Sequence, residues 1–278
     1  MEYVNSEEAK QEKYKVVYKA AKKFIKFDPV LIKNAFTALK SFAETKKETT
    51  KDLLEDEDNF IYVTITLSEI PLKFSPKPIK VPLKHPIYGS NYLTHICLFV
   101  KDPQRRYKDL VKDLEIPCLS KIIGYTKLLK NYKQYESRRQ LVHEFDLFFC
   151  DKRIYRMLPK VTGSFFYRKK KFPYPLEITE DGDSISEVIK DALKGTYLMP
   201  GNGPHYSFRV ARTSMETKAA IQNVVVGIYR ALPYILKGEL KPNKVQSITL
   251  KIDKSPELPI YCYLSKKDAA AYLEHKDD

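Results

Sequence analysis

The protein has 278 residues, of which 43% are hydrophobic and 12% aromatic, a composition that is globular and excludes a disordered or fibrous chain. Its 49 lysines and arginines exceed its 35 acidic residues and give a net charge of +14. Such a charge attracts polyanions, so nucleic acid or an acidic surface is the first class of partner to consider.

Two helices are predicted before the first strand. The first has an apolar stripe with helical spacing, formed by Tyr14, Val17, Tyr18, Ala21 and Ile25. Asp28 and Pro29 then begin a second helix, because Asp accepts amide hydrogen bonds at a helix start and Pro suits the first turn. The predicted buried stripe of this helix is Leu31, Ala35, Leu39 and Phe42.

Residues 60–67 alternate strictly between two faces and predict a half-buried strand. Its apolar face is Ile61, Val63, Ile65 and Leu67, and its outer face carries Phe60, Tyr62, Thr64 and Thr66. Two later strands alternate in the same way and place Ser207, Arg209, Thr249 and Lys251 on outer faces.

Two interpretations of this outer face remain open. Helices could cover it, or it could be an open surface that binds single-stranded or looped RNA through stacking and hydrogen bonds. On the second interpretation, the candidate RNA-binding residues are Tyr62, Thr64, Arg209 and Arg212.

The segment Pro71 to Pro86 holds five prolines and four lysines but no acidic residue. Any strand in it must be short or lie at a sheet edge, because proline cannot donate a backbone hydrogen bond. Its lysines are further candidate RNA-binding residues, namely Lys73, Lys77, Lys80 and Lys84.

The middle of the chain has a different periodicity. Apolar runs at residues 96–100, 121–125 and 147–150 alternate with predicted helices, which indicates a small parallel sheet covered by helices. A second proline corner lies at residues 172–175. We therefore expect an α/β protein of two domains, with a split α+β domain from residues 1–85 and 173–278 and an inserted α/β domain at residues 86–172.

Eight basic residues and no acid lie between Lys152 and Lys171. Their densest run follows three aromatic residues, Phe165, Phe166 and Tyr167, so phosphate neutralisation and stacking can occur together. The other interpretation is a solvated loop or a nuclear-import signal with buried aromatic rings. The candidate RNA-binding residues of this run are Arg168, Lys169, Lys170 and Lys171.

The sequence has no phosphate-binding glycine motif, no nucleophile motif and no metal-binding spacing among its cysteines and histidines. We therefore expect no enzymatic activity, no cofactor and no metal. No stretch approaches the ~20 apolar residues of a membrane span, and no apolar leader follows the N-terminus. We expect a soluble intracellular protein with no membrane partner.

Three blocks at residues 96–102, 145–154 and 158–166 resemble the ribosomal protein L1 (L-one) family, the family of the ribosomal stalk protein. More narrowly they resemble its fungal and animal ribosome-biogenesis branch. The most specific block is D-x-R-I-x-x-x-L-P-x-x-x-G, which begins at Asp151, and the likeness extends from about Phe60 to Tyr263.

The resemblance implies a split α+β domain, an inserted Rossmann-like domain and rRNA binding without catalysis. It implies a nucleolar assembly factor that binds precursor rRNA together with other ribosome assembly factors, as a monomer within a large ribonucleoprotein particle. Where stalk proteins carry a Thr-Met-Gly-Pro element, this sequence reads Glu257 to Tyr261, the form of the biogenesis branch, which favours precursor rRNA.

We expect action on large-subunit precursors (pre-60S) and rRNA processing. A small-subunit role and a protein-protein adaptor role are the alternatives. Branch members often carry lysine-rich tails, and their absence here suggests a shortened chain.

Overall fold

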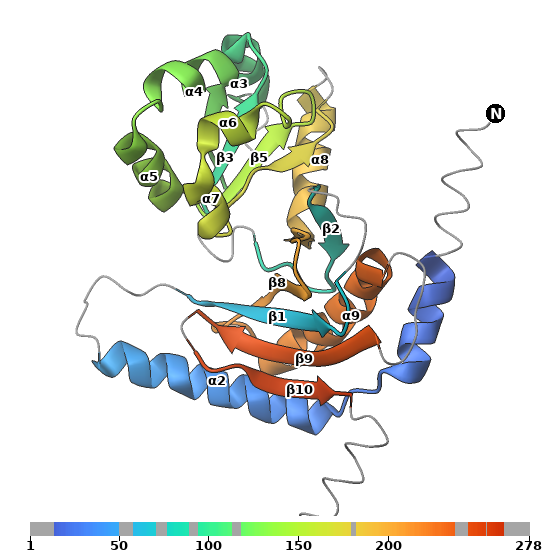
Figure 1. Ribbon diagram of the computed structural model, residues 1–278. Coiled ribbons are helices and arrows are strands. Elements are labelled where there is room, and N and C mark those ends of the chain that lie inside the picture. Colours follow the sequence, from blue (N-terminus) through green and yellow to red (C-terminus); the bar gives the residue numbers. More distant parts are fainter. Residues whose placement is uncertain are drawn as a thin grey trace, which may run out of the picture. The chain divides into compact units, whose positions relative to one another are not determined.

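The computed structural model describes residues 14–49, 58–70, 77–88, 94–112, 118–178, 182–236, 244–253 and 255–263. The chain divides into two compact units (Figure 1). The terminal unit comprises Met1–His85 and Thr196–Asp278, and the inserted unit comprises Pro86–Gly195.

The terminal unit is built on a four-stranded antiparallel sheet with the order β10-β9-β1-β8. Two further strands, β2 and β7, form a separate two-stranded sheet. The strands are β1 (Phe60–Leu67), β2 (Ile79–Pro82), β7 (Gly195–Leu198), β8 (His205–Arg212), β9 (Val245–Ile252) and β10 (Leu258–Cys262).

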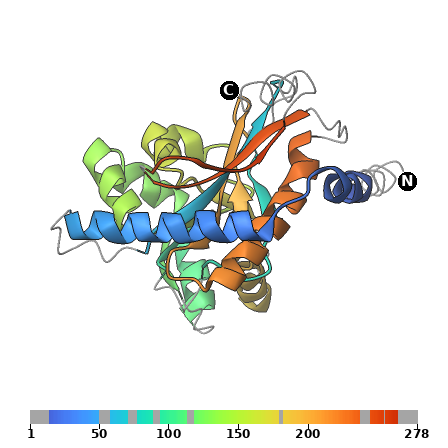
Figure 2. The same ribbon diagram turned by 90° about the horizontal axis from the view of Figure 1, so that it is seen from below.

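The apolar face of the four-stranded sheet packs against two long helices, α2 (Pro29–Thr49) and α9 (Thr217–Leu236). Ile61, Val63 and Ile65 are fully buried there, as their alternation in the sequence predicts. Helix α2 contacts β9 and β10, α9 contacts β8, and the two helices contact each other. Figure 2 shows α2 lying across the sheet. Residues 14–24 form a further helix.

The buried stripe of α2 differs from the predicted one. Leu31 and Phe42 are 43% and 36% exposed, whereas Ile32, Phe36 and Leu39 are buried. Both stripes satisfy a period of 3.6 residues, because the helix carries apolar residues around more than half of its circumference. The choice between them depends on how the helix rests on the sheet.

Helix α9 corrects the expectation that no stretch of this chain resembles a membrane span. By length and composition it is apolar enough to cross a membrane, and it is the one such helix among the described residues. Most of it is buried, however, including Val224, Ile228 and Leu232, so it serves as the core helix of the terminal unit.

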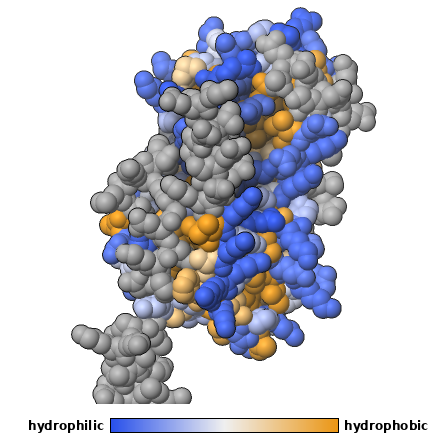
Figure 3. Space-filling view, turned by 90° about the vertical axis from the view of Figure 1, so that its right-hand side faces the viewer, coloured by the Kyte–Doolittle hydropathy of each residue, from blue (hydrophilic) through white to orange (hydrophobic). Residues whose placement is uncertain are grey.

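Hydrophilic side chains are spread over the face drawn in Figure 3, and apolar ones lie between them.

The chain leaves the terminal unit at His85, whose backbone is held by α9. The Asn223 side chain accepts a hydrogen bond from His85 N at 2.8 Å and donates one to His85 O at 2.9 Å. Asn223 is fully buried. The first crossing therefore begins from a fixed backbone position.

The inserted unit contains a parallel sheet with the order β4-β3-β5-β6, built from apolar strands whose central members are buried on both faces. Its strands are β3 (Ile96–Val100), β4 (Leu119–Gly124), β5 (Leu147–Asp151) and β6 (Tyr174–Leu176). Its helices are α3 (Gln104–Lys112), α4 (Tyr125–Asn131), α5 (Tyr135–Glu144), α6 (Leu158–Thr162), α7 (Ser164–Arg168) and α8 (Gly182–Leu193).

The inserted unit continues beyond the predicted end at residue 172. Strand β6 pairs in parallel with β5, and α8 contacts both β6 and α3. The proline corner at residues 172–175 is therefore the entrance to an edge strand. Pro175 is tolerated in β6 because one side of an edge strand needs no backbone donor.

Candidate nucleic-acid interface

The second face of the four-stranded sheet, hereafter the polar face, is organised in rows of paired residues. Because residues directly opposite each other in antiparallel strands share a face, the register defines these rows. From β8 through β1 to β9 they are Arg209–Tyr62–Lys251, Ser207–Thr64–Thr249 and His205–Thr66–Ser247. The structure thus brings Tyr62, Thr64 and Arg209 together, as predicted.

The terminal unit leaves this face without a helical cover. Helices α2 and α9 both pack on the apolar face, and no other described helix of the unit contacts the four-stranded sheet closely. No described helix of this unit therefore covers the polar face, although Thr64, Arg209 and Thr249 on it are buried.

Two arginines of the polar face are packed against aromatic rings. The guanidinium carbon of Arg209 lies 4.2 Å from the centroid of Phe60 and 6.0 Å from that of Tyr62. Arg212 also lies 4.2 Å from Phe60 and forms an ion pair with Asp58 at 3.5 Å. Arg209 and Arg212 are only 7% and 5% exposed. They hold the rings in place and contribute charge from beneath the surface.

Thr64 is more buried than a contact residue should be. It is 4% exposed, and its hydroxyl has no hydrogen-bond partner in the structure as described. Its neighbour Thr249 donates a hydrogen bond to Glu257. The accessible residues of the polar face are therefore those around Thr64, namely Tyr62, Thr66 and Lys251, which are half-buried.

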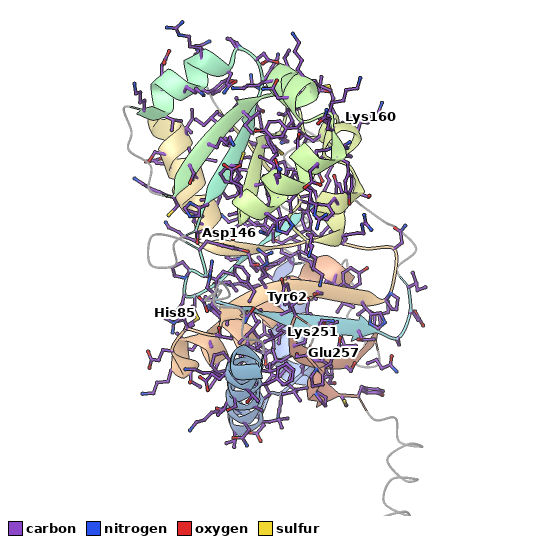
Figure 4. All side chains as sticks on the ribbon, turned by 90° about the vertical axis from the view of Figure 1, so that its left-hand side faces the viewer. Tyr62, His85, Asp146, Lys160, Lys251 and Glu257 are labelled. Atoms are coloured by element: carbon purple, nitrogen blue, oxygen red, sulfur yellow. The ribbon has the colours of Figure 1, made fainter. Side chains whose placement is uncertain are left out.

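Glu257 places one carboxylate on the basic side of this face. It accepts hydrogen bonds from Lys251 Nζ at 2.5 Å and from Thr249 Oγ1 at 2.9 Å. The hydrogen bond from Lys251 is the main cause that lowers the pKa of Glu257 below its usual value. Tyr62 and Lys251 lie on the neighbouring strands β1 and β9, and Glu257 directly precedes β10 (Figure 4). The predicted set lacked this pairing, although the strand alternation already placed Lys251 on this face.

The predicted lysines of the proline-rich segment lie elsewhere in the terminal unit. Lys73 falls outside the described residues. Lys80 lies in β2, and Lys77 and Lys84 flank that strand and are exposed. Because β2 pairs with β7, the structure does not bring these lysines into the four-stranded sheet.

The predicted basic run of the inserted unit divides into two kinds of residue. Arg168, Lys169 and Lys170 are exposed. Lys171 instead donates hydrogen bonds to the carbonyl oxygens of Val142 and Phe145, at 3.1 and 2.9 Å. It therefore caps the C-terminal end of α5, where a cation is favourable.

Other basic residues near this run are also engaged within the fold. Arg153 Nε donates to the carboxylate of Asp151 at 2.8 Å and its Nη2 to the hydroxyl of Tyr107 at 2.9 Å. Lys152 pairs with Glu177. A count of positive charges in the sequence thus overstates the charge that is available to a ligand.

Comparison with known proteins identifies the family. The model of the ribosomal protein L1p/L10e family matches residues 39–256. The chain belongs to this family. The matched range includes strands β1, β8 and β9 and the whole inserted unit.

Relatives of this L1-family protein are named for ribosome biogenesis or for the domain. It is 32% identical over 232 residues to C8F11.04 of Schizosaccharomyces pombe, which is named for ribosome biogenesis; the match covers 79% of this chain and 58% of that protein. It is 31% identical over 248 residues to Ribosomal L1 domain-containing protein 1 of Mus musculus, covering 85% and 52%. Ribosome biogenesis protein UTP30 of Saccharomyces cerevisiae is 27% identical over 195 residues, covering 63% and 70%. The chain thus spans little more than half of the first two relatives.

Proposed function

We propose that this L1-family protein is a non-enzymatic ribosome assembly factor that binds precursor rRNA. It acts in the nucleolus, on pre-ribosomal particles of the large subunit, together with other assembly factors, and supports rRNA processing. The names of its relatives support the assignment to ribosome biogenesis. Its net charge of +14 supports a polyanionic partner.

The observation that carries the proposal is the row Arg209–Tyr62–Lys251 on the polar face. Tyr62 offers a ring for stacking with an unpaired base, and Lys251 offers a cation for a phosphate. The guanidinium carbon of Arg209 lies 6.0 Å from the centroid of the Tyr62 ring, within cation–π distance, and this contact favours one position of the ring. A ring held in place before binding loses less conformational freedom when a base stacks on it.

The test is the variant Tyr62→Ala with Tyr62→Phe as its matched control. We expect Tyr62→Ala to weaken binding of the precursor rRNA fragment by roughly 5- to 150-fold, since stacking is worth ~1–3 kcal/mol per base. Tyr62→Phe keeps the ring and should bind nearly as well as the wild type. Affinities for precursor and random RNA are measured by fluorescence anisotropy.

The thermal unfolding midpoint of each variant separates binding from packing. A destabilised Tyr62→Ala that still discriminates between the two RNAs would exclude the polar face as the binding surface. Association with pre-ribosomal particles that survives the complete loss of RNA binding would favour the protein-protein adaptor role.

A further inference from the structure

A second group of aromatic and basic side chains lies on the inserted unit, between helices α5 and α7. The rings of Tyr135, which begins α5, and Phe165, on α7, have centroids 6.0 Å apart and an interplanar angle of 70°. The ring of His143, near the end of α5, lies 6.2 Å from Phe165. The two helices lie side by side in Figure 1 and contact each other.

The spacing of these residues puts cations beside the rings. Arg139 lies one turn from both Tyr135 and His143 on α5, so the three share one helix face. Arg168 and Lys169 follow Phe165 by three and four residues, and Lys169 N donates to Phe165 O at 3.1 Å. Arg139, Arg168 and Lys169 are all exposed. We call these six residues the α5–α7 patch: Tyr135, Arg139, His143, Phe165, Arg168 and Lys169.

Tyr135 is more exposed than Phe165, the aromatic residue of the patch that it contacts. It is 53% exposed, whereas Phe165 is half-buried and packs against the core of the inserted unit. The ring of Phe165 therefore supports the ring of Tyr135 from the protein side, and one face or edge of Tyr135 stays accessible to a ligand.

The side chain of Arg138 is not part of the patch, because it binds backbone carbonyl groups next to it. Arg138 donates hydrogen bonds to Val161 O at 3.3 Å and to Lys133 O at 2.9 Å, which ties the start of α5 to the end of α6. The acids of α5 are few: Glu144 is paired with Lys121 at 3.0 Å, and Glu136 lies one residue beyond Tyr135. The charge around the rings is thus predominantly positive.

We propose that the α5–α7 patch binds an unpaired stretch of RNA, as a second contact separate from the polar face. A base stacks on Tyr135, and Arg139, Arg168 and Lys169 neutralise the adjoining phosphates. The combination of rings and cations favours a nucleic acid, in which every nucleotide joins a flat base to a phosphate, over an acidic protein segment, whose charged side chains carry no ring. The inference rests on the proposed function only in taking RNA as the ligand.

The experiment uses the full chain and a fluorescein-labelled single-stranded oligouridine as the probe. Three variants are compared: Tyr135→Ala, Tyr135→Phe and Leu129→Ala. Leu129 on α4 is a matched control, because it is an exposed apolar residue of the same unit outside the patch. We expect Tyr135→Ala to bind about five-fold or more weakly, and the other two to bind like the wild type.

A charge variant gives a second readout. Arg139→Ala should reduce the slope of log affinity against log salt by about 0.7, the value for one phosphate contact with single-stranded nucleic acid. Photocrosslinking with a 5-bromouridine probe should attach RNA to the peptide that contains Tyr135 or Phe165. Equal binding by wild type and Tyr135→Ala, with no crosslink in this peptide, would overturn the proposal.

The outcomes distinguish this inference from the proposed function. If Tyr62→Ala weakens binding and Tyr135→Ala does not, the polar face stands and the α5–α7 patch is excluded. If neither variant has an effect, the proposed function fails as well. Displacement of the probe by polyglutamate as readily as by unlabelled oligouridine would indicate an acidic protein partner and would also overturn the proposal.

Discussion

Charged side chains on the polar face already have partners inside the protein. Arg212 pairs with Asp58, Lys251 pairs with Glu257, and Arg209 stacks over two rings. RNA that binds here must therefore replace interactions as well as add them. Lys251 is the residue for which this exchange is simplest, because its ammonium group can turn from the carboxylate of Glu257 toward a phosphate.

The variant Glu257→Gln tests this exchange. Removing the carboxylate's charge frees Lys251, so RNA binding should strengthen and its salt slope should steepen by about 0.7–0.9. Binding is measured by anisotropy titration at several salt concentrations. Glu187→Gln serves as the control, because Glu187 is an exposed acid on α8 in the inserted unit. An unchanged slope in Glu257→Gln would show that Lys251 does not contact phosphate.

At the level of elements, the strand β8 shows what alternation in a sequence predicts and what it misses. Strict alternation would put Arg209 and Arg212 on opposite faces. The register between β1 and β8 shifts between Ile61 and Tyr62, so Arg212 pairs with Phe60 and Arg209 with Tyr62. This irregularity brings both arginines to the same face, and no residue pattern within β8 predicts it.

The strands themselves were more predictable than their surroundings. The burial of Ile61 and Val63 follows from a period of two, and the parallel sheet follows from apolar strands that alternate with helices. The predicted buried stripe of α2 and the predicted end of the inserted unit differ from the structure, because both depend on packing between elements. The role of Lys171 as a helix cap was hidden for the same reason, since its acceptors lie 26 and 29 residues away.

Gly163, which joins α6 to α7, is a position where the element boundary requires glycine. Its φ is +73° and its ψ 179°, a conformation that other residues rarely adopt. A Cβ there would lie 2.9 Å from Arg138 Nη1, the atom that donates to Val161 O. Gly163→Ala should therefore destabilise the protein by about 1–3 kcal/mol in urea unfolding.

Gly201→Ala is the matched control for this loss of stability. Gly201 is exposed, and its nearest neighbour for an added Cβ is 3.9 Å away. It should unfold at nearly the wild-type urea concentration. Equal stabilities of the two variants would mean that α6 and α7 can adjust to a side chain at Gly163.

At the scale of the whole molecule, the two proposed RNA contacts belong to different compact units. The polar face lies on the terminal unit and the α5–α7 patch on the inserted unit. One RNA that reaches both contacts binds the second as an intramolecular step, at an effective concentration that reflects the chain linkage. Loss of either contact should then weaken a long RNA more than the same loss weakens a short oligonucleotide.

The inserted unit should fold as an independent fragment when its boundaries follow the structure. A fragment of residues 86–195 keeps all four strands of the parallel sheet and α8. A fragment of residues 86–172 lacks β6 and α8, so it exposes the edge of β5 and the surfaces that these elements cover. We expect a cooperative thermal transition by circular dichroism for the longer fragment and a lower midpoint or no transition for the shorter one. Equal midpoints would contradict the boundary at Gly195.

The prolines in the outer strands have a consequence for self-association. Among the described strands, β10 and β6 each form one edge of a sheet; β10 contains Pro259 beside a register shift, and β6 contains Pro175. An exposed edge strand is a template on which a second chain can add a strand and start aggregation. Proline removes a donor from that template, and the shift in β10 breaks its regular spacing. These two edges are therefore poor starting points for aggregation.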